Sequence, residues 1–156
     1  MMLVKNIITN GSHKDFIKLV QCLDTELHSR YGQLQQEYDK HNTLENIQDV
    51  VLLYQDGIPV ACGAFKKYDS NTVELKRIFV QPRHRGQGLA KQLIQYLEAL
   101  AAEQNYTWAV LETGIKQPEA IHLYSSRGYE IINNYGPYSE NENSVCMKKA
   151  LSQQRR

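Results

Sequence analysis

The basic stretch 83–85, Arg-His-Arg, is followed by Gly86 and Gly88 and then by an amphipathic run that begins at Leu89. A glycine-containing loop that leads into a helix presents free backbone N–H groups and the positive end of the helix dipole. Glycine lets an anion approach the backbone closely, and the neighbouring basic side chains add positive charge. These residues therefore predict a loop that binds a phosphate group.

Two other phosphate-binding motifs do not fit this stretch. A Walker loop requires Gly-x-x-x-x-Gly-Lys-Ser/Thr, which the sequence does not contain. A dinucleotide-binding fingerprint requires a glycine or an alanine three positions after the second glycine, where this chain has Lys91. The strands expected before the loop also form a meander and not a β-α-β unit, so neither motif explains the loop.

A strand and a helix are expected at the start of the chain. Residues 2–8 read as a short strand. Ser12 with Asp15 three positions later is a helix-start signature, apolar side chains follow at helical spacing, and Gly32 is a stop signal. Residues 33–48 are polar and weakly patterned, and they are expected to form a loop that could include a helical turn.

Three strands are expected next, as a β-meander. Residues 50–54 and 58–66 read as strands, and Asp56-Gly57 between them is a strong hairpin signal because such turns need positive φ. The third strand, residues 72–80, leads into the basic loop. The loop is therefore expected at the end of a strand and at the start of a helix.

Helices and strands are expected to alternate in the second half of the chain. An apolar stripe predicts a helix over residues 89–101. The nearly all-apolar run 107–114 reads as a buried strand, and residues 117–128 read as a short helix. Two closing strands, 129–132 and 144–151, complete the order β-α, β-meander, α-β-α-β-β.

The six residues 83–88 match the motif Arg/Gln-x-x-Gly-x-Gly/Ala. This motif resembles the pyrophosphate loop of the GCN5-related N-acetyltransferase (GNAT) family, whose members hold acetyl-CoA. The stretch 73–94, VELKRIFVQPRHRGQGLAKQLI, resembles the strand, loop and helix of that family throughout. The stretch 120–129, AIHLYSSRGY, resembles its second signature, in which a helix carries a tyrosine before a glycine and an aromatic residue. The order of elements also agrees along nearly the whole chain.

The resemblance implies a fold and a cosubstrate. One N-acetyltransferase domain of the α/β (α+β) class is expected over residues 1–156. Its central mixed, twisted β-sheet would be flanked by helices, and a splayed strand pair would bind acetyl-CoA, often at a β-bulge. Acetyl-CoA is expected as the cosubstrate, and no metal is expected.

The resemblance also assigns residues to acetyl-CoA. The backbone of residues 78–80 would pair with the pantetheine arm, and the backbone of the loop would hold the pyrophosphate, with Arg83 or Arg85 able to add a side-chain contact. Gln117 stands where the family often has asparagine. The residues so assigned are Ile78, Phe79, Val80, Arg83, His84, Arg85, Gly86, Gln87, Gly88, Leu89, Ala90, Gln117 and Tyr124.

Acetyl transfer to an amine has three chemical requirements. The amine must lose a proton, the developing oxyanion needs donors such as a strand N–H near Val80, and the departing thiolate can need a proton. Tyr124 matches the tyrosine of the family that donates this proton. Glu112 matches the base of members that acetylate protein N-termini, whereas Glu74 resembles the base of histone-acetylating members. Burial could raise the pKa of either carboxyl group toward the working pH, and a water chain that uses neither glutamate stays open.

Aromatic side chains are expected on the acceptor side. Tyr135 and Tyr138 flank a Gly-Pro turn before the final strand, and Tyr31 could belong to the opposite wall. An aromatic mouth suits a small amine or a flexible peptide end, although tyrosines that only pack on the turn fit equally well. A small-molecule amine is the expected acceptor. A protein N-terminal or lysine amine, and a non-catalytic acyl-CoA-binding regulator, are the alternatives.

The composition of the 156-residue chain restricts its partners. A net charge of +1 gives no general attraction to nucleic acid or to an anionic membrane. No apolar run reaches the roughly 18 residues of a membrane span, and the N-terminus does not read as a signal peptide. Three widely spaced cysteines without a Cys-x-x-Cys pair indicate reduced thiols and no metal site. A cytoplasmic monomer or homodimer is therefore expected.

Overall fold

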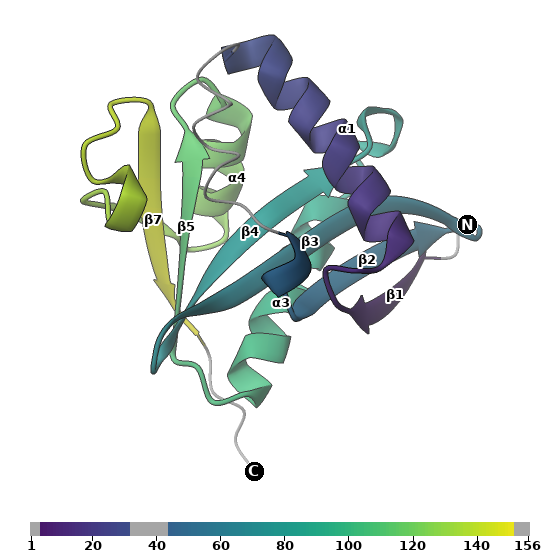
Figure 1. The fold of residues 1–156 in the computed structure, drawn as a ribbon, viewed down its shortest axis with the longest axis horizontal. Coiled ribbons are helices and arrows are strands. Elements are labelled where there is room, and N and C mark those ends of the chain that lie inside the picture. Colours follow the sequence, from purple (N-terminus) through teal and green to yellow (C-terminus); the bar gives the residue numbers. More distant parts are fainter. Residues whose placement is uncertain (1–3, 32–43, 152–156) are drawn as a thin grey trace. The chain divides into compact units, whose positions relative to one another are not determined.

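The computed structural model describes residues 4–31 and 44–151, and its elements follow the expected order (Figure 1). The helices are α1 (Lys14–Tyr31), α3 (Leu89–Glu103) and α4 (Pro118–Ser126), with 3₁₀ turns η1 (Leu44–Asn46), η2 (Pro82–His84) and η3 (Gly136–Tyr138). The strands are β1 (Val4–Thr9), β2 (Asp49–Gln55), β3 (Ile58–Asp69), β4 (Thr72–Val80), β5 (Trp108–Gly114), β6 (Glu130–Ile132) and β7 (Ser144–Ala150).

Seven strands in the described residues form one sheet in the order β1-β2-β3-β4-β5-β7-β6. Strands β4 and β5 are parallel, whereas β1–β2, β2–β3, β5–β7 and β6–β7 are antiparallel. The expected α/β (α+β) class, with a mixed sheet flanked by helices, is confirmed. No helix in residues 4–31 and 44–151 combines the length and apolar character needed to cross a membrane.

The chain divides into two compact units, which are described separately below. The first unit consists of Met1–Lys66 and Arg77–Leu97, and the second of Lys67–Lys76 and Glu98–Arg156. The boundaries fall within β3, β4 and α3, so the chain passes from one unit to the other inside regular elements. The expectation of one domain over residues 1–156 stays a prediction.

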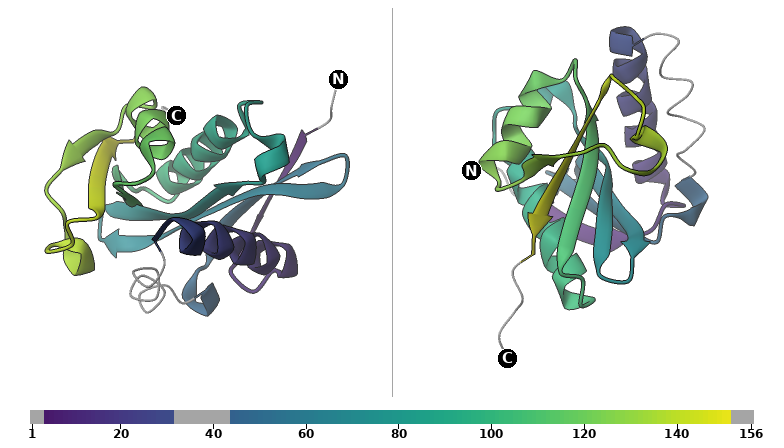
Figure 2. Two further views of the ribbon diagram at one scale, coloured as in Figure 1. Left: turned by 90° about the horizontal axis from the view of Figure 1, so that it is seen from above. Right: turned by 90° about the vertical axis from the view of Figure 1, so that its left-hand side faces the viewer.

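Two helices cover the strands of the first unit. Helix α1 lies on one face of β2 and β3, and the first part of α3 lies on the other (Figures 1 and 2). Side chains of β3 alternate between these faces: Cys62 and Ala64 join the core under α1, whereas Gly63 faces α3. A Cβ atom on Gly63 would lie 2.8 Å from Cδ1 of Leu97, so glycine permits close approach of the helix.

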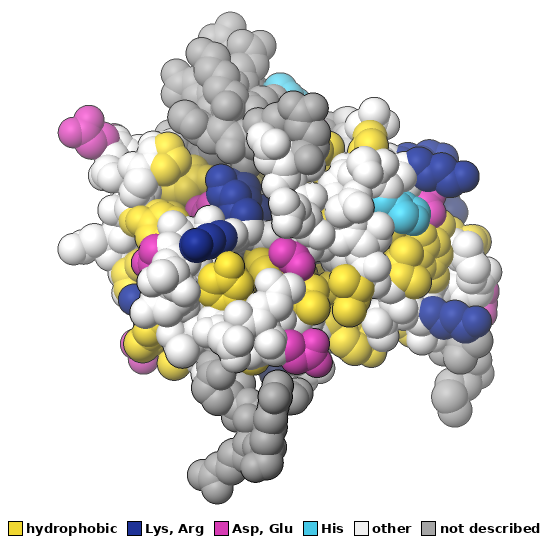
Figure 3. Space-filling view, turned by 60° about the horizontal axis from the view of Figure 1, so that its bottom comes forward, with side chains coloured by type: hydrophobic (Ala, Val, Ile, Leu, Met, Phe, Trp, Pro, Cys, Tyr) yellow, Lys and Arg dark blue, Asp and Glu magenta, His cyan; other side chains and the backbone are white. Residues whose placement is uncertain are grey.

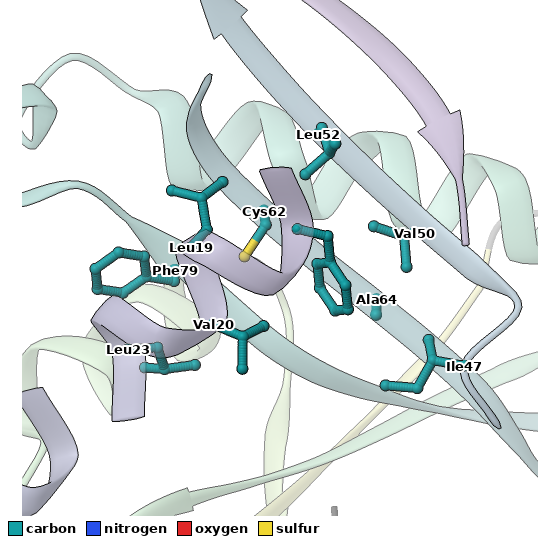
Figure 4. Packing of buried hydrophobic residues seen from close by; sticks show 10 residues of the cluster. Leu19, Val20, Leu23, Ile47, Val50, Leu52, Cys62, Ala64 and Phe79 are labelled. Atoms are coloured by element: carbon teal, nitrogen blue, oxygen red, sulfur yellow. The ribbon is translucent and has the colours of Figure 1, made fainter. Parts of the chain in front are cut away.

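The core under α1 is apolar and extends to β4. Burial of such a cluster is the main favourable term that holds an amphipathic helix on a sheet. Phe79 is the member from β4, so α1 packs directly on the strand that leads to the basic loop. The cluster consists of Phe16, Leu19, Val20, Leu23, Ile47, Val50, Leu52, Cys62, Ala64 and Phe79 (Figure 4).

The turn between β2 and β3 confirms its sequence signal. Asp56 and Gly57 have φ angles of 52° and 81°, as a two-residue hairpin of this type requires. Gly32, expected as the helix stop, lies outside the described residues. So does most of the loop expected at 33–48, of which η1 is the helical turn.

The start of α1 differs from the prediction. The helix begins at Lys14, and Nδ1 of His13 accepts a 3.1 Å hydrogen bond from the backbone N–H of Asp15. Asn10 explains the difference, because its Oδ1 accepts hydrogen bonds from both the N–H and the hydroxyl of Ser12. His13 therefore takes the capping role that the Ser12-Asp15 spacing had suggested for Ser12.

In the second unit a polar network holds the junction between α4 and β6. Gly128, with a φ of 95°, ends the helix and allows the N–H of Tyr129 to reach the carbonyl of Tyr124 (3.0 Å). The carboxylate of Glu98 accepts hydrogen bonds from the hydroxyl of Tyr129 (2.8 Å) and from the ammonium of Lys149 (2.9 Å). These contacts determine where the C-terminal turn of α4 lies within this unit.

Candidate active site

The phosphate-loop motif lies between β4 and α3 in the first unit. Gly86 and Gly88 have φ angles of 83° and 79°, which L-side chains rarely adopt. A Cβ atom on either glycine would have no neighbour within 4 Å, so the space beside the loop is open. The first N–H groups of α3 have no partner within the helix and follow directly on this loop. The geometry is that of an anion site at a helix N-terminus.

A buried glutamine side chain contacts two residues of the loop. Gln55, at the end of β2, is 4% exposed. Its Oε1 lies 2.9 Å from Nδ1 of His84, and its amide nitrogen donates to Oε1 of Gln87 (3.0 Å). One side chain thus contacts residues on both sides of Gly86. The sequence analysis did not identify Gln55. A polar residue at the end of a buried strand is expected to form hydrogen bonds, and this could have indicated its role.

The guanidinium of Arg85 forms hydrogen bonds to other residues of the protein. Its two terminal guanidinium nitrogens each donate to a carboxylate oxygen of Glu26, both at 2.9 Å. Its Nε donates to the carbonyl of Val80 (2.9 Å), and the guanidinium lies 5.5 Å from the ring centroid of Phe79. Arg83 is exposed and has no ion-pair partner in the part of the chain that the structure describes.

Strand β4 changes conformation shortly before the loop. The paired residues of β4 and β5 end at Leu75 and Leu111, and Arg77 then has a φ of 58°. The guanidinium of Arg77 lies 2.8 Å from a carboxylate oxygen of Asp24 on α1. The backbone carbonyl of Arg77 accepts a hydrogen bond from Sγ of Cys62 (3.3 Å). Contacts from α1 and β3 therefore hold this distortion, after which residues 78–80 follow.

The second unit gathers the candidate catalytic carboxylates on one face of its sheet. Val110 of β5 is in register with Glu74 of β4, and Glu112 of β5 with Cys146 of β7. Residues in register share a face, and the pattern repeats every two residues. Ser144, two residues before Cys146, therefore lies on the same face as both glutamates.

Glu74 is buried within a cluster of polar and aromatic groups. It is 5% exposed, accepts a 2.7 Å hydrogen bond from the hydroxyl of Tyr135, and lies 3.5 Å from the ammonium of Lys76. Lys76 also donates to the hydroxyl of Tyr138 (3.4 Å). Burial, and then the negative charge of Glu74, raise the pKa of Tyr135. Tyr135 therefore remains a hydrogen-bond donor to Glu74 at neutral pH.

Aromatic rings surround this cluster. The ring of Tyr135 makes edge-to-face contacts with Tyr68 (5.1 Å between centroids) and Tyr138 (5.7 Å), an arrangement that favours ring packing. Tyr138 is 5% exposed, whereas Tyr68 is 46% exposed. The two tyrosines of the loop thus contact each other and the Glu74 cluster. Tyr31 ends α1, and its side chain lies outside the described residues.

Glu112 has a different environment from Glu74. It is half-buried, and its Oε2 accepts a 2.6 Å hydrogen bond from the hydroxyl of Ser144. Its negative charge also reaches Tyr124, whose pKa it helps to raise. The structure thereby brings a carboxylate and a tyrosine within electrostatic reach of each other in one unit.

Tyr124 lies on α4 and is 8% exposed. Burial is the main reason that its pKa is raised, followed by the charge of Glu112, so its hydroxyl stays protonated at neutral pH. The ring contacts Tyr129 edge-to-face at 5.9 Å. Among the described residues the hydroxyl has no hydrogen-bond partner. Gln117 precedes the helix as its N-cap and makes no side-chain capping bond.

Cys146 is a poor candidate for a covalent nucleophile. The pKa of its thiol is raised to about 11, mainly by burial; a hydrogen bond with the backbone of Tyr135 lowers the pKa, and the charges of Glu112 and Glu74 contribute to the rise. The thiol is therefore protonated near neutral pH, and the thiolate is the reactive form. All three cysteines are free. Within the described residues no group of three or more His, Cys, Asp or Glu side chains could hold a metal ion.

The charged side chains of the described residues are mixed on the face drawn in Figure 3. Lysine, arginine, aspartate and glutamate stand among hydrophobic and neutral groups, and neither sign forms a continuous field there. A mixed surface gives little long-range steering of a charged partner.

The sequence profile of the Acetyltransferase (GNAT) family matches residues 15–129. A protein of Azospirillum brasilense named IAA acetyltransferase is 34% identical over 98 residues, which cover 62% of this chain and 64% of that protein. The matched stretches span between 59% and 64% of the length of three curated relatives.

Two solved structures of similar fold are an acyltransferase and an acetyltransferase by name. A protein of Klebsiella pneumoniae assigned as an acyl-CoA N-acyltransferase has a TM-score of 0.79 at 29% identity, covering 97% of this chain and 99% of that one. A GNAT family acetyltransferase of Elizabethkingia anophelis, solved with acetyl-CoA bound, has a TM-score of 0.69 at 17% identity, covering 95% and 98%. At the lower identity the likeness shows the fold alone.

The loop geometry predicts that Gly86→Ala weakens coenzyme A binding by about tenfold or more, because a side chain at positive φ distorts the loop and fills the open space. Gly57→Ala is the matched control, since Gly57 also has positive φ (81°) and open space around its Cβ position. Both variants should lose similar thermal stability, and only Gly86→Ala should lose affinity in isothermal titration calorimetry. Equal affinity of the two variants would contradict the assignment of the loop.

Proposed function

This chain belongs to the GNAT acetyltransferase family, a family of acyltransferases, and we propose that it transfers the acetyl group of acetyl-CoA to a primary amine of a small molecule. The amine attacks the thioester directly, without a covalent enzyme intermediate. The observation that carries this proposal is the open loop with positive-φ Gly86 and Gly88 at the N-terminus of α3; in the second unit, burial and the charge of Glu112 keep the hydroxyl of Tyr124 protonated. A carboxylate can take the proton of the amine, and a phenol can return one to the leaving thiolate.

The residues of the basic loop fit the pyrophosphate of acetyl-CoA. The two positive-φ glycines leave open space where a side chain would otherwise lie, and the helix N-terminus supplies N–H donors. Arg83 is the better candidate for a side-chain contact with phosphate, because Arg85 is engaged by Glu26 and Val80. When bound, acetyl-CoA supplies the activated thioester. Residues 78–80, which follow the distortion of β4, are proposed to pair with the pantetheine arm.

Glu112 is the better candidate for the general base. Glu74 is nearly inaccessible and is already held by Tyr135 and Lys76, so its charge is balanced locally. Glu112 is more exposed and lies within electrostatic reach of Tyr124. We therefore assign the base to Glu112, and to Glu74 the role of holding the loop that contains Tyr135.

Tyr124 is proposed as the general acid. Its raised pKa keeps the proton on the hydroxyl, and the hydroxyl is not used in the structure of the described residues. A phenol that makes no hydrogen bond within the described residues has one to offer to a ligand. The departing thiolate of CoA is the acceptor that the family chemistry provides.

The proposal also covers the class of acceptor, the domain organisation, the oligomeric state and the location of the protein. Tyr135 and Tyr138 are proposed to contact the body of the acceptor, which suits a small amine, and the role expected for Tyr31 stays a prediction. A protein N-terminal or lysine amine is the alternative acceptor, and an acyl-CoA-binding regulator is the alternative function. We also propose a single domain over residues 1–156, acting as a monomer or homodimer in the cytoplasm, in keeping with three free thiols.

The proposed activity predicts release of the CoA thiol from acetyl-CoA in the presence of a suitable amine. The panel is 2-phenylethylamine, glucosamine, spermidine, lysine and a short peptide with a free N-terminus. Turnover is followed with a thiol reagent beside a thermal-shift titration with coenzyme A. Faster thiol release with one of the small amines than with the peptide supports the proposal. Release with the peptide alone would replace the acceptor class, and stabilisation by coenzyme A without any release would favour the regulator.

The base assignment predicts that Glu112→Gln lowers kcat/KM by about 10² to 10⁴, as expected for loss of a general base. Glu74→Gln is the matched control, because it removes a carboxylate on the same sheet face. It should mainly reduce stability and raise the KM of the amine, since the negative charge beside Tyr135 and Lys76 is lost. Profiles of kcat/KM against pH distinguish the two variants, because only Glu112→Gln should abolish the acidic limb of the profile. The reverse result would transfer the base to Glu74.

The acid assignment predicts that Tyr124→Phe lowers kcat by about 10² at unchanged KM for acetyl-CoA. The phenyl ring preserves the packing against Tyr129, so folding should be little affected. Tyr129→Phe is the control, because it removes a hydroxyl that bonds to Glu98 instead and should act on stability more than on kcat. A kcat for Tyr124→Phe that equals the wild-type value across pH would rule out the acid role.

A further inference from the structure

Gln55, the last residue of β2, is a polar side chain in an apolar part of the first unit. It follows Val51 and Leu53 at alternate positions of the strand, and both of these are fully buried. Its backbone lies in register with Val4 of β1 and Ile58 of β3, so the end of the strand is held on both sides. Gln55 itself is 4% exposed. A buried amide at such a position needs hydrogen-bond partners within the protein.

Both contacts of the Gln55 side chain are with the basic loop. Its amide nitrogen donates a 3.0 Å hydrogen bond to Oε1 of Gln87. Its Oε1 therefore faces His84 as an acceptor, and Nδ1 of His84, 2.9 Å away, is the donor. His84 and Gln87 lie on either side of Arg85 and Gly86 in the sequence. One buried amide thus connects the first part of the loop with the part that leads into α3.

A β-bulge in β3 supports the entry to the same loop. The register between β2 and β3 shifts between Leu53 and Tyr54, where Val60 is the extra residue of β3. The carbonyl of Val60 accepts a 2.8 Å hydrogen bond from the N–H of Gln81. The loop is thus anchored to β3 before its first basic residue and to β2 on both sides of Gly86.

The glycines are the reason that this anchoring affects binding. Gly86 and Gly88 have more conformational freedom than other residues in the unfolded loop, and both adopt positive φ in the folded one. Ordering such a segment at the moment of binding costs conformational entropy and weakens affinity. Hydrogen bonds that hold the loop before the anion arrives remove part of this cost.

We propose that Gln55 is a positioning residue for the cosubstrate: by connecting His84 to Gln87 it holds the backbone around Gly86 in the shape that receives the pyrophosphate of acetyl-CoA. Gln55 acts through these two residues and does not touch the ligand itself. This inference rests on the proposed function, because it requires the basic loop to bind acetyl-CoA. The effect of Gln55 therefore lies in the affinity for the phosphate-containing part of the cosubstrate and not in the chemical step.

The test uses Gln55→Met, which has a similar size and shape but cannot form these hydrogen bonds. Tyr54→Phe is the matched control, because it removes a hydroxyl of the neighbouring residue of β2 that bonds to Asp15 of α1 (2.6 Å) and not to the loop. Affinity for coenzyme A is measured by isothermal titration calorimetry, and stability by thermal denaturation. Turnover is compared between acetyl-CoA and S-acetylpantetheine, a thioester without the pyrophosphate, with the fastest small amine of the panel.

Gln55→Met should weaken coenzyme A binding by about five- to tenfold, as expected for loss of one net hydrogen bond. It should raise the KM for acetyl-CoA by a similar factor at unchanged kcat, and kcat/KM with S-acetylpantetheine should keep the wild-type value. Tyr54→Phe should lower thermal stability and leave the affinity for coenzyme A unchanged. In a protein that carries both His84→Ala and Gln87→Ala, Gln55→Met should cause no further loss of affinity.

A second variant is available if Gln55→Met does not fold. Gln55→Asn keeps an amide, but its side chain is one methylene shorter and cannot hold both loop residues at the observed distances. It should lower the affinity for coenzyme A in the same direction and by a smaller factor, again with kcat unchanged.

Three results would overturn the inference. The first is wild-type affinity for coenzyme A in Gln55→Met, or in Gln55→Asn where that variant replaces it. The second is an equal loss of kcat/KM with both thioesters, which would indicate a general effect on the fold. The third is a further loss of affinity in the His84→Ala, Gln87→Ala background, which would show that Gln55 acts by another route. Failure of the wild-type protein to bind coenzyme A would instead remove the proposed function, and titration of the wild type alone reports that failure.

Discussion

The conformation of Arg77 is the constraint on which the arrangement of the first unit depends. A non-glycine residue with a φ of 58° is unfavourable in a strand, and here its side chain forms an ion pair with Asp24 of α1. The distortion changes the course of β4 just before residues 78–80 and the basic loop. Because α1 packs on Phe79 through its apolar face, one helix supports both the distortion and the strand beyond it.

The basic loop is held by side chains that come from other parts of the first unit. Gln55 contacts both His84 and Gln87, and Glu26 holds the guanidinium of Arg85. A loop that is ordered before the anion arrives loses less conformational entropy on binding. The loop therefore uses one of its two arginines for its own structure and leaves Arg83 exposed beside the open backbone.

Two glutamates on one sheet face of the second unit have different neighbours. Glu74 is surrounded by Tyr135 and Lys76, which compensate its charge. Glu112 accepts a short hydrogen bond from Ser144, and its charge helps to raise the pKa of Tyr124. Two carboxylates with the same intrinsic chemistry thus differ in exposure and in the groups that they affect. Such a difference in environment allows one carboxylate to hold the structure while the other takes part in catalysis.

The sequence by itself determined the features that depend on short stretches of chain. The Asp56-Gly57 turn, the strand-loop-helix motif around Gly86 and the helix that carries Tyr124 were predicted correctly, because turn residues and hydrophobic periodicity act within a few residues. The cap of α1 was assigned to Ser12 and not to His13, because a side chain just outside the signature, Asn10, competes for Ser12.

Only the tertiary structure decided the partners of the charged groups. Arg85 meets Glu26 across 59 positions of sequence, Tyr135 meets Glu74 across 61, and Ser144 meets Glu112 across 32. No local pattern encodes such pairs, because each depends on strand register and on where a helix or loop packs. The same long-range contacts set which carboxylate is buried, which arginine is engaged and which tyrosine keeps a hydroxyl available, and these properties determine the chemistry that the residues can perform.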